Sequence, residues 1–551
     1  MLVALAVTDP GSAGGARLCR IADDGRPAGQ VEHVSDLAAT VRSTGPVRWL
    51  WPSTAEIYPH LLRAGVRVER CHDLELTEAL LLGHAGRWGE PRSVAAVWAR
   101  LTGAPVPADP PPRAGAPPGD LQGALFEAAP APPALLGVDP IQALIEGYAD
   151  QQARLEATPD PARLRLLVAA ESAGALIAAE MGHDGLPWHA DVHDKLLVEL
   201  LGEPSPMGGP PRHLAELSEA IADAFGGYRI HPESPAEVLR AFRRQGISLP
   251  STRAWVLRGV DHPAIPLLLE YKELYRIWTA HGWTWRHQWI RDGRFHPEWI
   301  PAGVVSGRWA TRGGGALQIP KVVRRAVRAD PGWALVVADA GQLEPRILAA
   351  VSGDPKMSRA AGAGDMYAAL ATEAFAGDRA TAKVALLGAM YGQVGGQAAP
   401  ALATLRNSYP TAFAYVEEAA RTGEAGGLVR SWLGRTCPPP SATSAQLDPE
   451  TGPAAARARG RFTRNFVIQA TAAEWALSLL ALLRSGLTGT GARLVFFQHD
   501  EVIVHAPADR VAEVVAAIES AGERTRRLLF GDTPVRFPLG ISVVDCYADA
   551  K

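Results

Sequence analysis

An uninterrupted apolar run in the C-terminal half of the chain ends on an aspartate. The five residues from Ala334 to Ala338 are all apolar, as in a strand buried on both faces, and Asp339 follows directly. A helix is predicted to begin at about Glu344. The pattern therefore predicts a strand, a turn and a helix, with a carboxylate where the strand ends.

A second pair of apolar runs predicts a β-hairpin. Leu494–Phe497 and Val502–Val504 are strand-like and flank four polar residues, which place Asp500 at the hairpin tip. If the two strand ends are neighbours, Asp500 and Asp339 lie a few Å apart and can share divalent metal. Carboxylate oxygens beside substrate phosphates suit Mg²⁺. The alternative is that each aspartate only caps a turn.

A third segment has the spacing of a helix with cations on one face. Arg379, Lys383, Leu387 and Tyr391 recur every four residues and so lie along one side. The two cations are suited to a triphosphate, with Tyr391 further along, near a sugar or base. The alternative is an amphipathic helix with a basic edge.

The rest of the pattern predicts several domains. Strand-like runs and helical patterns are mixed in the first hundred residues, which indicates an α/β unit. Residues 103–139 are rich in Pro, Ala and Gly and are predicted to form a flexible linker. A long helical stretch follows, and from Trp333 strands and helices alternate.

Composition bounds the class of protein. A chain of 551 residues is too long for one core, and 47% apolar with 21% charged residues is typical of a globular protein. The N-terminus lacks the features of a signal peptide, and no charge-free apolar stretch predicts a membrane span. The four scattered cysteines fit reduced thiols in the cytoplasm, so we expect a cytoplasmic, nucleoid-associated protein without membrane contact.

The net charge of −3 does not by itself indicate nucleic-acid binding. Basic residues are concentrated locally, however, in RARGRFTRN (457–465) and KVVRRAVR (321–328). Such runs can contact phosphates, although solvated surface is the alternative for each run alone.

These segments together resemble the motifs of family A DNA polymerases, the DNA polymerase I type. The likeness covers roughly residues 165 to 551, with five motifs in the family's order. They are SGRWATRGGGALQIP (306–320), motif A as DAGQLEPRI (339–347), motif B as RATAKVALLGAMYG (379–392), RNFVIQATAAEWA (464–476) and motif C as HDE (499–501).

The resemblance implies roles for single residues. Asp339 and Asp500 would bind two Mg²⁺ ions, with Mn²⁺ as a substitute, helped by the backbone carbonyl of Ala340. Lys383 would act as a proton donor to pyrophosphate. The incoming nucleotide would be held by Arg379, Lys383, Leu387, Tyr391, Glu344 and His499, with Glu344 as the steric gate against a ribose 2′-hydroxyl. Primer–template DNA would be contacted by Arg308, Gln318, Arg464, Asn465, Gln469 and Glu501.

Four positions depart from the family pattern. Leu386 and Leu387 stand where asparagine and an aromatic residue are usual, and a leucine cannot stack as a ring does. Ala340 and Pro345 stand where tyrosine and leucine are usual. We expect a slower or less faithful enzyme than is typical of the family, which ordinary ratios of dideoxynucleotide and ribonucleotide incorporation would contradict.

By its position, the N-terminal region resembles the 3′–5′ proofreading exonuclease domain of the same family. That chemistry requires four carboxylates, and the first strand has no Asp-x-Glu pair. Asp73 matches the middle aspartate, whereas Gln152, four residues after Tyr148, stands where aspartate is required. We therefore expect a folded domain without exonuclease activity, and no counterpart of the 5′ nuclease domain.

The predicted linker contains a candidate partner motif. Gln122, Leu125 and Phe126 fit the QxxLF pentapeptide with which bacterial replication proteins bind the sliding clamp. The alternative is a chance match in an alanine-rich segment.

The sequence thus predicts an α/β multidomain protein, in which an exonuclease-like (RNase H-like) domain precedes a right-hand polymerase domain. The predicted parts are an exonuclease-like domain (1–102 and 140–165), a linker (103–139) and a polymerase domain (166–551). Within the polymerase domain we expect a thumb (about 166–290), a palm (about 291–354 and 456–551) and fingers (about 355–455). The predicted activity is DNA-templated addition of dNTPs to a primer 3′-hydroxyl by a two-metal mechanism, in repair or gap filling. The alternatives are a single-subunit RNA polymerase and a non-catalytic DNA-binding scaffold.

Overall fold

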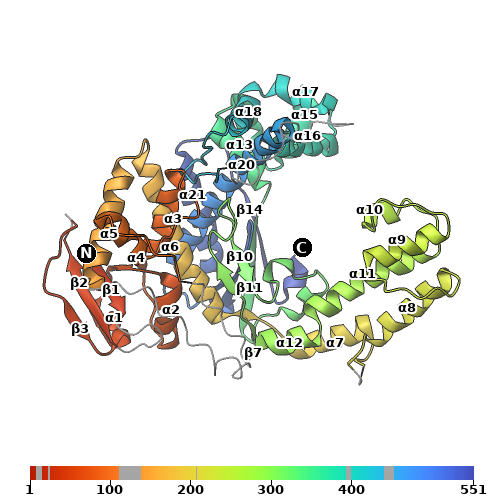
Figure 1. Ribbon diagram of the computed structural model, residues 1–551, viewed down its shortest axis with the longest axis horizontal. Coiled ribbons are helices and arrows are strands. Elements are labelled where there is room, and N and C mark those ends of the chain that lie inside the picture. The colour runs from red at the N-terminus through yellow and green to blue at the C-terminus, as the bar shows by residue number, and fades with distance from the viewer. Residues whose placement is uncertain are drawn as a thin grey trace. The chain divides into compact units, whose positions relative to one another are not determined.

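The structure is a computed structural model of the chain that divides into two compact units (Figure 1). Unit 1 comprises Met1–Asp184, Glu298–Ala310 and Val336–Val543, and unit 2 comprises Gly185–Pro297, Thr311–Leu335 and Val544–Lys551. The described residues are 1–7, 15–22, 25–110, 138–205, 208–392, 399–439 and 452–550. Most of the predicted linker, together with Gln122, Leu125 and Phe126, lies outside them.

Unit 1 begins with a five-stranded mixed sheet. Its order is β3-β2-β1-β4-β5, with β1, β2 and β3 antiparallel and β1, β4 and β5 parallel. The strands are β1 (Leu2–Val7), β2 (Ala16–Ile21), β3 (Glu32–Val34), β4 (Arg48–Trp51) and β5 (Arg70–Asp73). The predicted α/β unit is confirmed, although β5, with the sequence Arg-Cys-His-Asp, was not predicted because it is too short and polar to read as a strand.

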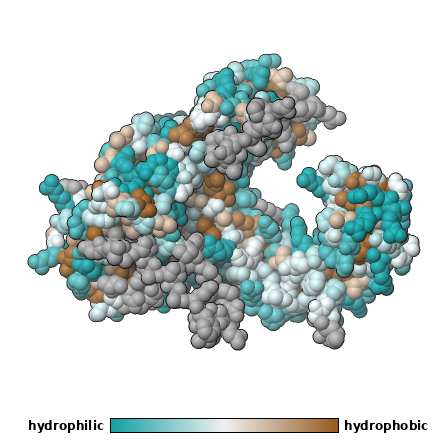
Figure 2. Space-filling model, viewed as in Figure 1, coloured by the Kyte–Doolittle hydropathy of each residue, from teal (hydrophilic) through white to brown (hydrophobic). Residues whose placement is uncertain are grey.

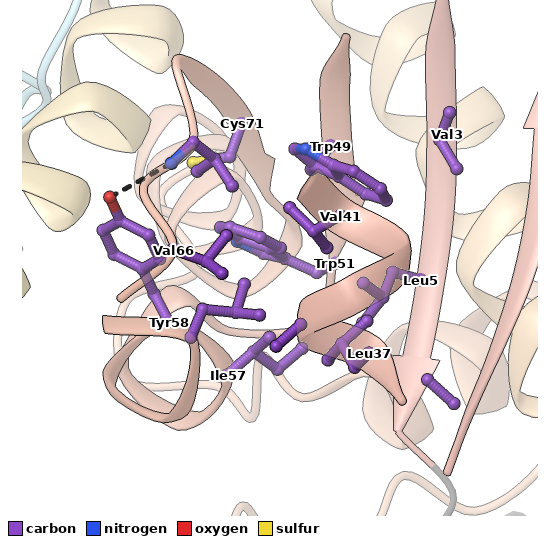
Figure 3. Packing of buried hydrophobic residues seen from close by; sticks show 14 of the residues in the cluster. Val3, Leu5, Leu37, Val41, Trp49, Trp51, Ile57, Tyr58, Val66 and Cys71 are labelled. Carbon is purple, nitrogen blue, oxygen red and sulfur yellow. Dashed lines mark hydrogen bonds between the residues drawn. The ribbon is translucent and has the colours of Figure 1, made fainter. Parts of the chain in front are cut away.

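The apolar first strand is buried on both faces. Val3 and Leu5 point into one core, and Ala4 and Ala6 into another on the opposite side of the sheet. Figure 3 shows Trp49 and Trp51 of β4 in the first core, packed with side chains from the helices that cover it. The helices of this region are α1 (Leu37–Thr44), α2 (Thr54–Arg63), α3 (Leu74–His84), α4 (Val94–Thr102), α5 (Pro140–Glu156) and α6 (Pro161–Asp184).

The remainder of unit 1 surrounds most of a second sheet, ordered β12-β13-β11-β14. Strands β9 and β10 form a separate pair. The strands are β9 (Glu298–Ile300), β10 (Ala310–Arg312), β11 (Trp333–Ala340), β12 (Arg493–Gln498), β13 (Glu501–Pro507) and β14 (Leu539–Val544). The helices are α13 (Leu343–Ser352), α14 (Pro355–Ala361), α15 (Met366–Ala374), α16 (Arg379–Tyr391), α17 (Ala399–Ser408), α18 (Pro410–Glu424), α20 (Gly452–Gly486) and α21 (Val511–Phe530). The predicted strand (β11), hairpin (β12 and β13) and helix over Arg379–Tyr391 (α16) are all present.

Helix α20 is long and apolar enough to cross a membrane by length and composition alone. However, 78% of its most apolar 18-residue window is buried inside the structure. That degree of burial is typical of a core helix, and α20 packs against α6, α18 and α21.

One arginine joins α20 to the N-terminal part of unit 1. Arg484 donates to Glu180 of α6 at 2.7 and 2.9 Å, and also to the backbone carbonyl oxygens of Val68 and Glu69 before β5. The hydroxyl of Tyr58 donates to the same Glu180 carboxylate at 2.5 Å. Because both charged side chains are largely buried, at 15% and 11% exposed, this group is part of the interior.

Unit 2 is mostly helical and has its own core. The core includes Leu197, Phe242, Leu257 and Leu268, which come from α7, α9, α10 and α11. The helices are α7 (Ala190–Leu201), α8 (Arg212–Ala224), α9 (Pro235–Arg244), α10 (Ala254–Leu257), α11 (Ala264–His281) and α12 (Trp283–Trp289). A small sheet in the order β6-β8-β7 accompanies them, with β6 (Leu186–Pro187), β7 (Ile290–Arg291) and β8 (Arg294–Phe295).

Aromatic rings enclose two histidines in unit 2. His193 and His281 are 0% and 2% exposed. Burial lowers the pKa of each imidazole to about 4. Arg286 and Arg276 act in the same direction on His193 and His281 respectively, whereas Asp194 opposes the shift at His193. Both rings are therefore neutral at pH 7.

Acid is expected to destabilise unit 2 through these rings. Since the folded-state pKa lies below the ordinary value of 6.5, the unfolded chain binds protons first, and stability is lost as pH falls from 6.5 towards about 4. For His281 the loss at pH 5 is about 2 kcal/mol. Urea unfolding at pH 7 and pH 5 measures it, with His281→Leu as the variant that cannot titrate. The same pH dependence in both proteins would contradict the prediction.

Candidate active site

The second sheet brings the two predicted metal aspartates together. Asp339 is the last residue but one of β11, and Asp500 lies in the two-residue turn between β12 and β13. The amide of Ala340 donates to the backbone carbonyl oxygen of Asp500 at 3.1 Å, so the hairpin tip rests against the end of β11. The hairpin is longer than predicted, because Gln498 and Glu501 pair with each other inside the ladder.

The backbone is strained beside each aspartate. His499 and Gln342 have φ values of 59° and 58°, a left-handed conformation that is uncommon outside glycine. The amide of Asp500 donates back to the carbonyl oxygen of Gln498 at 2.8 Å, which closes the turn tightly. Strain of this kind collects at functional sites, where the surrounding structure holds it.

Glu344 bridges two residues that come from distant parts of the chain. Arg308 donates to one carboxylate oxygen at 2.6 Å, and the hydroxyl of Tyr391 donates to the other at 2.5 Å. Burial and this bond to Glu344 raise the pKa of Tyr391, which keeps the phenol protonated. Burial and Arg308 lower the pKa of His499. The structure thus places three predicted site residues, Arg308, Tyr391 and His499, near the carboxylate of a fourth, Glu344.

Helix α16 presents the predicted phosphate-binding residues, and Asp365 holds one of them. Arg379 donates through Nε to Asp365 at 2.8 Å, and Gln342 donates to the other oxygen of that carboxylate at 2.7 Å. Although burial acts to raise it, these two bonds lower the pKa of Asp365 to about 2. The pair is 53% and 42% exposed, so a polyphosphate could replace it at little cost. Lys383 is exposed one turn further along.

Leu386 and Leu387, the two departures in motif B, have different surroundings. Leu386 is buried at 2% exposed, whereas Leu387 is partly exposed on the same side of α16 as Lys383. Pro345 lies in the first turn of α13, where a missing amide proton is tolerated, and the helix continues through it.

Arg346 is fully buried next to the end of β11, and its bonds are to neutral oxygens. Its guanidinium donates to the carbonyl oxygens of Ala361 at 2.6 Å, Gly364 at 2.7 Å, Arg536 at 2.9 Å and Gly341 at 3.0 Å. It therefore joins the end of β11 to the segment after α14 and to the segment before β14.

The predicted DNA contacts are placed differently from one another. Gln469 and Asn465 are partly exposed on α20, and Asn465 has a buried Oδ1 without a partner among the described residues. Glu501 is buried in β13, and Gln318 is exposed in unit 2. Arg464 is buried and bonds Glu417 and the carbonyl oxygen of Ala389. This placement gives Arg464 protein partners, and a DNA contact stays a prediction for it.

Sequence reasoning missed Gln342 and Asp365, which link the strand end to α16, and Arg346, which links it to the segment after α14. Asp365 is also the N-cap of α15, accepting from the amide of Ala368, and an aspartate before a helix reads first as a cap. The sequence did offer one signal for Gln342 and Arg346, because both lie within seven residues of Asp339 in motif A.

The possible metal ligands, Asp339, Asp500 and the carbonyl oxygen of Ala340, suit a metal ion that substrate also binds better than one held by the protein alone. Within the described ranges, no group of three or more His, Cys, Asp or Glu side chains is arranged to hold a metal ion. Two aspartates at adjoining strand ends, with the backbone oxygen of Ala340 between them in sequence, supply hard ligands for part of a coordination shell. Substrate phosphates would have to complete it.

The aspartate predicted to survive from an exonuclease site is engaged in capping. Asp73 is 2% exposed and accepts from the amides of Thr54 at 2.7 Å and Leu76 at 2.9 Å, one on each oxygen. Both carboxylate oxygens thus stabilise helix starts. Gln152 is partly exposed, and Tyr148 packs edge-on against His72.

A cluster of buried charged and polar side chains lies next to His72, around Glu78. Glu78 is 0% exposed and accepts from Arg100 at 2.9 Å, Gln151 at 3.1 Å and Arg154. His72 bonds Gln151, and burial lowers its pKa to about 3, so the ring is neutral. The only buried glutamate of this group is therefore already neutralised by arginine.

Comparison with solved structures places the fold. The POL domain of Pol1 from M. smegmatis, solved in complex with DNA primer-template and dNTP, has a similar fold with a TM-score of 0.72. The match covers 99% of this chain and 95% of that one at 17% sequence identity. The mixed α/β multidomain fold is thus that of a DNA polymerase I polymerase domain.

Comparison of sequences identifies the family. The chain is 28% identical over 312 residues to the thermostable DNA polymerase I of Thermus filiformis, and 26% identical over 373 residues to DNA polymerase I of Deinococcus radiodurans. These matches cover 52% and 60% of the chain but only 36% and 37% of those relatives, so the chain spans little more than a third of their length. The profile of DNA polymerase family A matches residues 212–543, well over half of the chain. The chain belongs to DNA polymerase family A.

Proposed function

We propose that this chain is a DNA-templated DNA polymerase that adds dNTPs to a primer 3′-hydroxyl. The observation that carries the proposal is the backbone contact of the Asp500 turn with Ala340, the residue after Asp339 at the end of β11. Members of this family use divalent metal ions, and metal bound here would neutralise phosphate charge and favour ionisation of the primer hydroxyl.

The chain's own residues would then divide the remaining work. Arg379 and Lys383 are placed on one side of α16 to bind the triphosphate. The 3′ oxygen of the primer forms a bond to the α-phosphorus while the bond to pyrophosphate breaks, and Lys383 supplies the proton that pyrophosphate takes up. Asp339 and Asp500 would hold the metal ions that position the reacting groups, and positioning accounts for much of the catalysis in phosphoryl transfer.

Primer extension on gapped DNA with Mg²⁺ and dNTPs tests the proposal. Extension that stops when a chelator removes the metal, and returns with Mg²⁺ or Mn²⁺, would support it. Tight DNA binding without extension would instead indicate a non-catalytic scaffold, and preference for ribonucleotides would indicate an RNA polymerase. Salt should weaken the binding steeply, as phosphate contacts do.

Removing the carboxylate of Glu344 is expected to admit ribonucleotides. Glu344→Ala opens the space beside the sugar and releases Tyr391 and Arg308, so incorporation of rNTP relative to dNTP should rise about tenfold or more, the value of one or two kcal/mol of lost discrimination. Single-nucleotide insertion measures the ratio. Tyr391→Phe is the matched control, because it removes one bond and keeps the carboxylate. An unchanged ratio in Glu344→Ala would contradict a gating role.

We further propose that the N-terminal region is an exonuclease-like domain without activity. Support comes from Asp73, whose oxygens both cap helices, and from Gln152, a poor metal ligand where aspartate is required. The sheet order, three antiparallel strands followed by two parallel ones, suits an RNase H-like domain. A mismatched primer incubated with Mg²⁺ but without dNTPs should keep its length, and shortening by wild type would contradict the proposal.

Three further parts of the proposal rest on the sequence alone. They are a role in repair or gap filling, the division into thumb, palm and fingers, and clamp binding through Leu125 and Phe126. Helix α6 runs unbroken through the expected boundary between residues 165 and 166. Equal binding of the sliding clamp by wild type and a Leu125→Ala/Phe126→Ala variant would exclude the clamp site.

A further inference from the structure

The interior of unit 1 holds a pair of opposite charges next to the turn that carries Arg308. Glu171 of α6 and Arg435 are 1% and 5% exposed, and the guanidinium of Arg435 donates to the Glu171 carboxylate. On the face drawn in Figure 2, by contrast, hydrophilic residues are spread over the surface, where water solvates charge. Because taking two charges out of water costs free energy, a buried pair is weak evidence for stability, and what it contacts matters more.

Arg435 belongs to a loop that is fastened to α20. Within the loop, the amide of Ser431 donates to the carbonyl oxygen of Arg435 at 2.9 Å. Glu474 of α20 accepts from the amide of Leu433 at 3.0 Å and from the hydroxyl of Ser431. Burial raises the pKa of Glu474 to about 7, and the charge of Arg435 acts in the opposite direction. The guanidinium therefore has a defined place, beside both Glu171 and Glu474.

The backbone of Gly307 lies directly against this guanidinium. A Cβ atom at Gly307 would be 2.4 Å from Nε of Arg435 and 2.6 Å from its Cζ, which is far inside van der Waals contact. Gly307 also has a φ of 84°, in the left-handed region that favours glycine. Position 307 thus leaves room for the guanidinium because it has no side chain.

Gly307 is part of the turn that carries Arg308. The amide of Gly307 donates to the carbonyl oxygen of Val304 at 2.7 Å, and the amide of Val304 donates to that of Arg308 at 3.0 Å. The side chain of Arg308 then donates to the Glu344 carboxylate at 2.6 Å. The position of this turn therefore determines where the Arg308 guanidinium meets Glu344.

Helix α6 supports the turn on its other side as well. Trp309, which follows the turn, is 5% exposed and packs edge-on against Phe497 of β12, with the ring centroids 5.2 Å apart. A Cβ atom at Gly174 would be 3.5 Å from the Trp309 ring, so the backbone of α6 lies against it. Gly174 is about one helical turn after Glu171, the partner of Arg435. The same helix thus contacts Trp309 directly and holds Arg435 through Glu171.

We propose that Arg435 is a positioning residue for sugar selection, which acts on Glu344 through the turn at Gly307. The inference rests on the proposed polymerase function, in which Glu344 excludes a ribose 2′-hydroxyl. With Arg435 in place, Arg308 and Tyr391 hold one oxygen each of the Glu344 carboxylate. Without it, the turn is free to shift and Tyr391 alone holds Glu344, so the carboxylate can rotate away from the sugar and admit a ribonucleoside triphosphate.

Single-nucleotide insertion of rNTP relative to dNTP tests the inference. Arg435→Met should raise this ratio about three- to tenfold, the value of one hydrogen bond to the gate. The change leaves Glu171 buried without the Arg435 cation, so Glu171→Gln/Arg435→Met, which removes both charges, is the variant expected to fold well and to show the same rise. In a Glu344→Ala background, Arg435→Met should add nothing, because the gate on which it acts is gone.

The matched control is Arg484→Met/Glu180→Gln. It removes another buried arginine–glutamate pair between α20 and α6, further along α6 from Glu171. This variant should keep the wild-type ratio of rNTP to dNTP insertion. A general loss of packing between these two helices would raise the ratio in the control as well, and that result would overturn a specific role for Arg435.

Trypsin cleavage after Arg308, followed by mass spectrometry without DNA or nucleotide, reports on the turn itself. Glu171→Gln/Arg435→Met should be cleaved there faster than wild type, since the turn opens more readily, whereas the control should be cleaved at the wild-type rate. Unchanged cleavage, an unchanged ratio in an active enzyme, or a rise that persists in the Glu344→Ala background would each overturn the inference alone. A wild type that inserts no dNTP would overturn the proposed function, and the role in sugar selection with it.

Discussion

Replacing Asp500 with alanine is expected to lower the rate of primer extension by about a thousandfold or more, while DNA binding is retained. The loss of one of two metal-binding carboxylates removes several kcal/mol of charge stabilisation, and each 1.4 kcal/mol is about a factor of ten in rate. The bond between Asp500 and the amide of Ala340 uses the backbone carbonyl oxygen, so the variant keeps it. Single-turnover extension of a saturating primer–template measures the chemical step.

Two comparisons show whether the carboxylate itself is responsible. Asp500→Asn keeps the size of the side chain and should be nearly as slow, because a neutral amide is a poor ligand for Mg²⁺. Asp509→Ala, at a position where the side chain is 82% exposed just beyond β13, should extend primers as wild type does. Extension by Asp500→Ala at more than a tenth of the wild-type rate would remove this aspartate from the catalytic site.

The second large effect is expected on stability, from Arg484→Met. Arg484 bonds Glu180 and the backbone of Val68 and Glu69, and the change leaves a largely buried carboxylate whose remaining cation, Arg67, lies 3.7 Å away. Breaking a buried pair on one side costs about 3–5 kcal/mol. Urea unfolding of the full chain, followed by tryptophan fluorescence, measures this loss. The free energy of unfolding should fall by that amount, and the midpoint should move to a lower urea concentration.

The partner variants distinguish the pair from a general loss of packing. Arg484→Met/Glu180→Gln removes both charges and should recover part of the stability, since no ion is left unpaired. Arg527→Met removes an arginine of an exposed pair with Glu523 and should change stability by about 0.5 kcal/mol or less. An Arg484→Met protein as stable as wild type would show that α20 and the N-terminal region are held together by other contacts.

A loss of stability in Arg484→Met would show that the N-terminal region supports α20. Leu176 of α6 packs in the core of the first sheet, and Glu180, one turn later, receives Arg484. The N-terminal region thus supports the helix that carries Asn465 and Gln469.

Much of the local structure could be predicted from the sequence because it depends on neighbouring residues. The run ending at Asp339 is a strand since its residues are apolar on both faces, and Asp500 is at a hairpin tip since polar residues interrupt two such runs. The face shared by Arg379, Lys383 and Tyr391 follows from helical spacing alone.

Contacts between distant segments could not be predicted in this way. Nothing in the periodicity links Arg308 to Glu344, or Asp365 to both Gln342 and Arg379, because each pair is joined only by the packing of separate elements. Arg464 is a residue whose burial could not be predicted for the same reason. Its place in a basic run suggests an exposed cation, but the fold buries it against Glu417.

The guanidinium of Arg346 determines where a hinge can lie in this active site. Its bonds to the carbonyl oxygens of Gly341, Ala361 and Gly364 would all have to break before the end of β11 could move relative to the segment after α14. Gln342 also ties the next two residues to this strand end, because it donates to Asp365 at 2.7 Å and accepts from the amide of Met366 at 2.8 Å. A swing of α15 and α16 about Gly364 would therefore break these bonds as well, at the residue that holds Arg379.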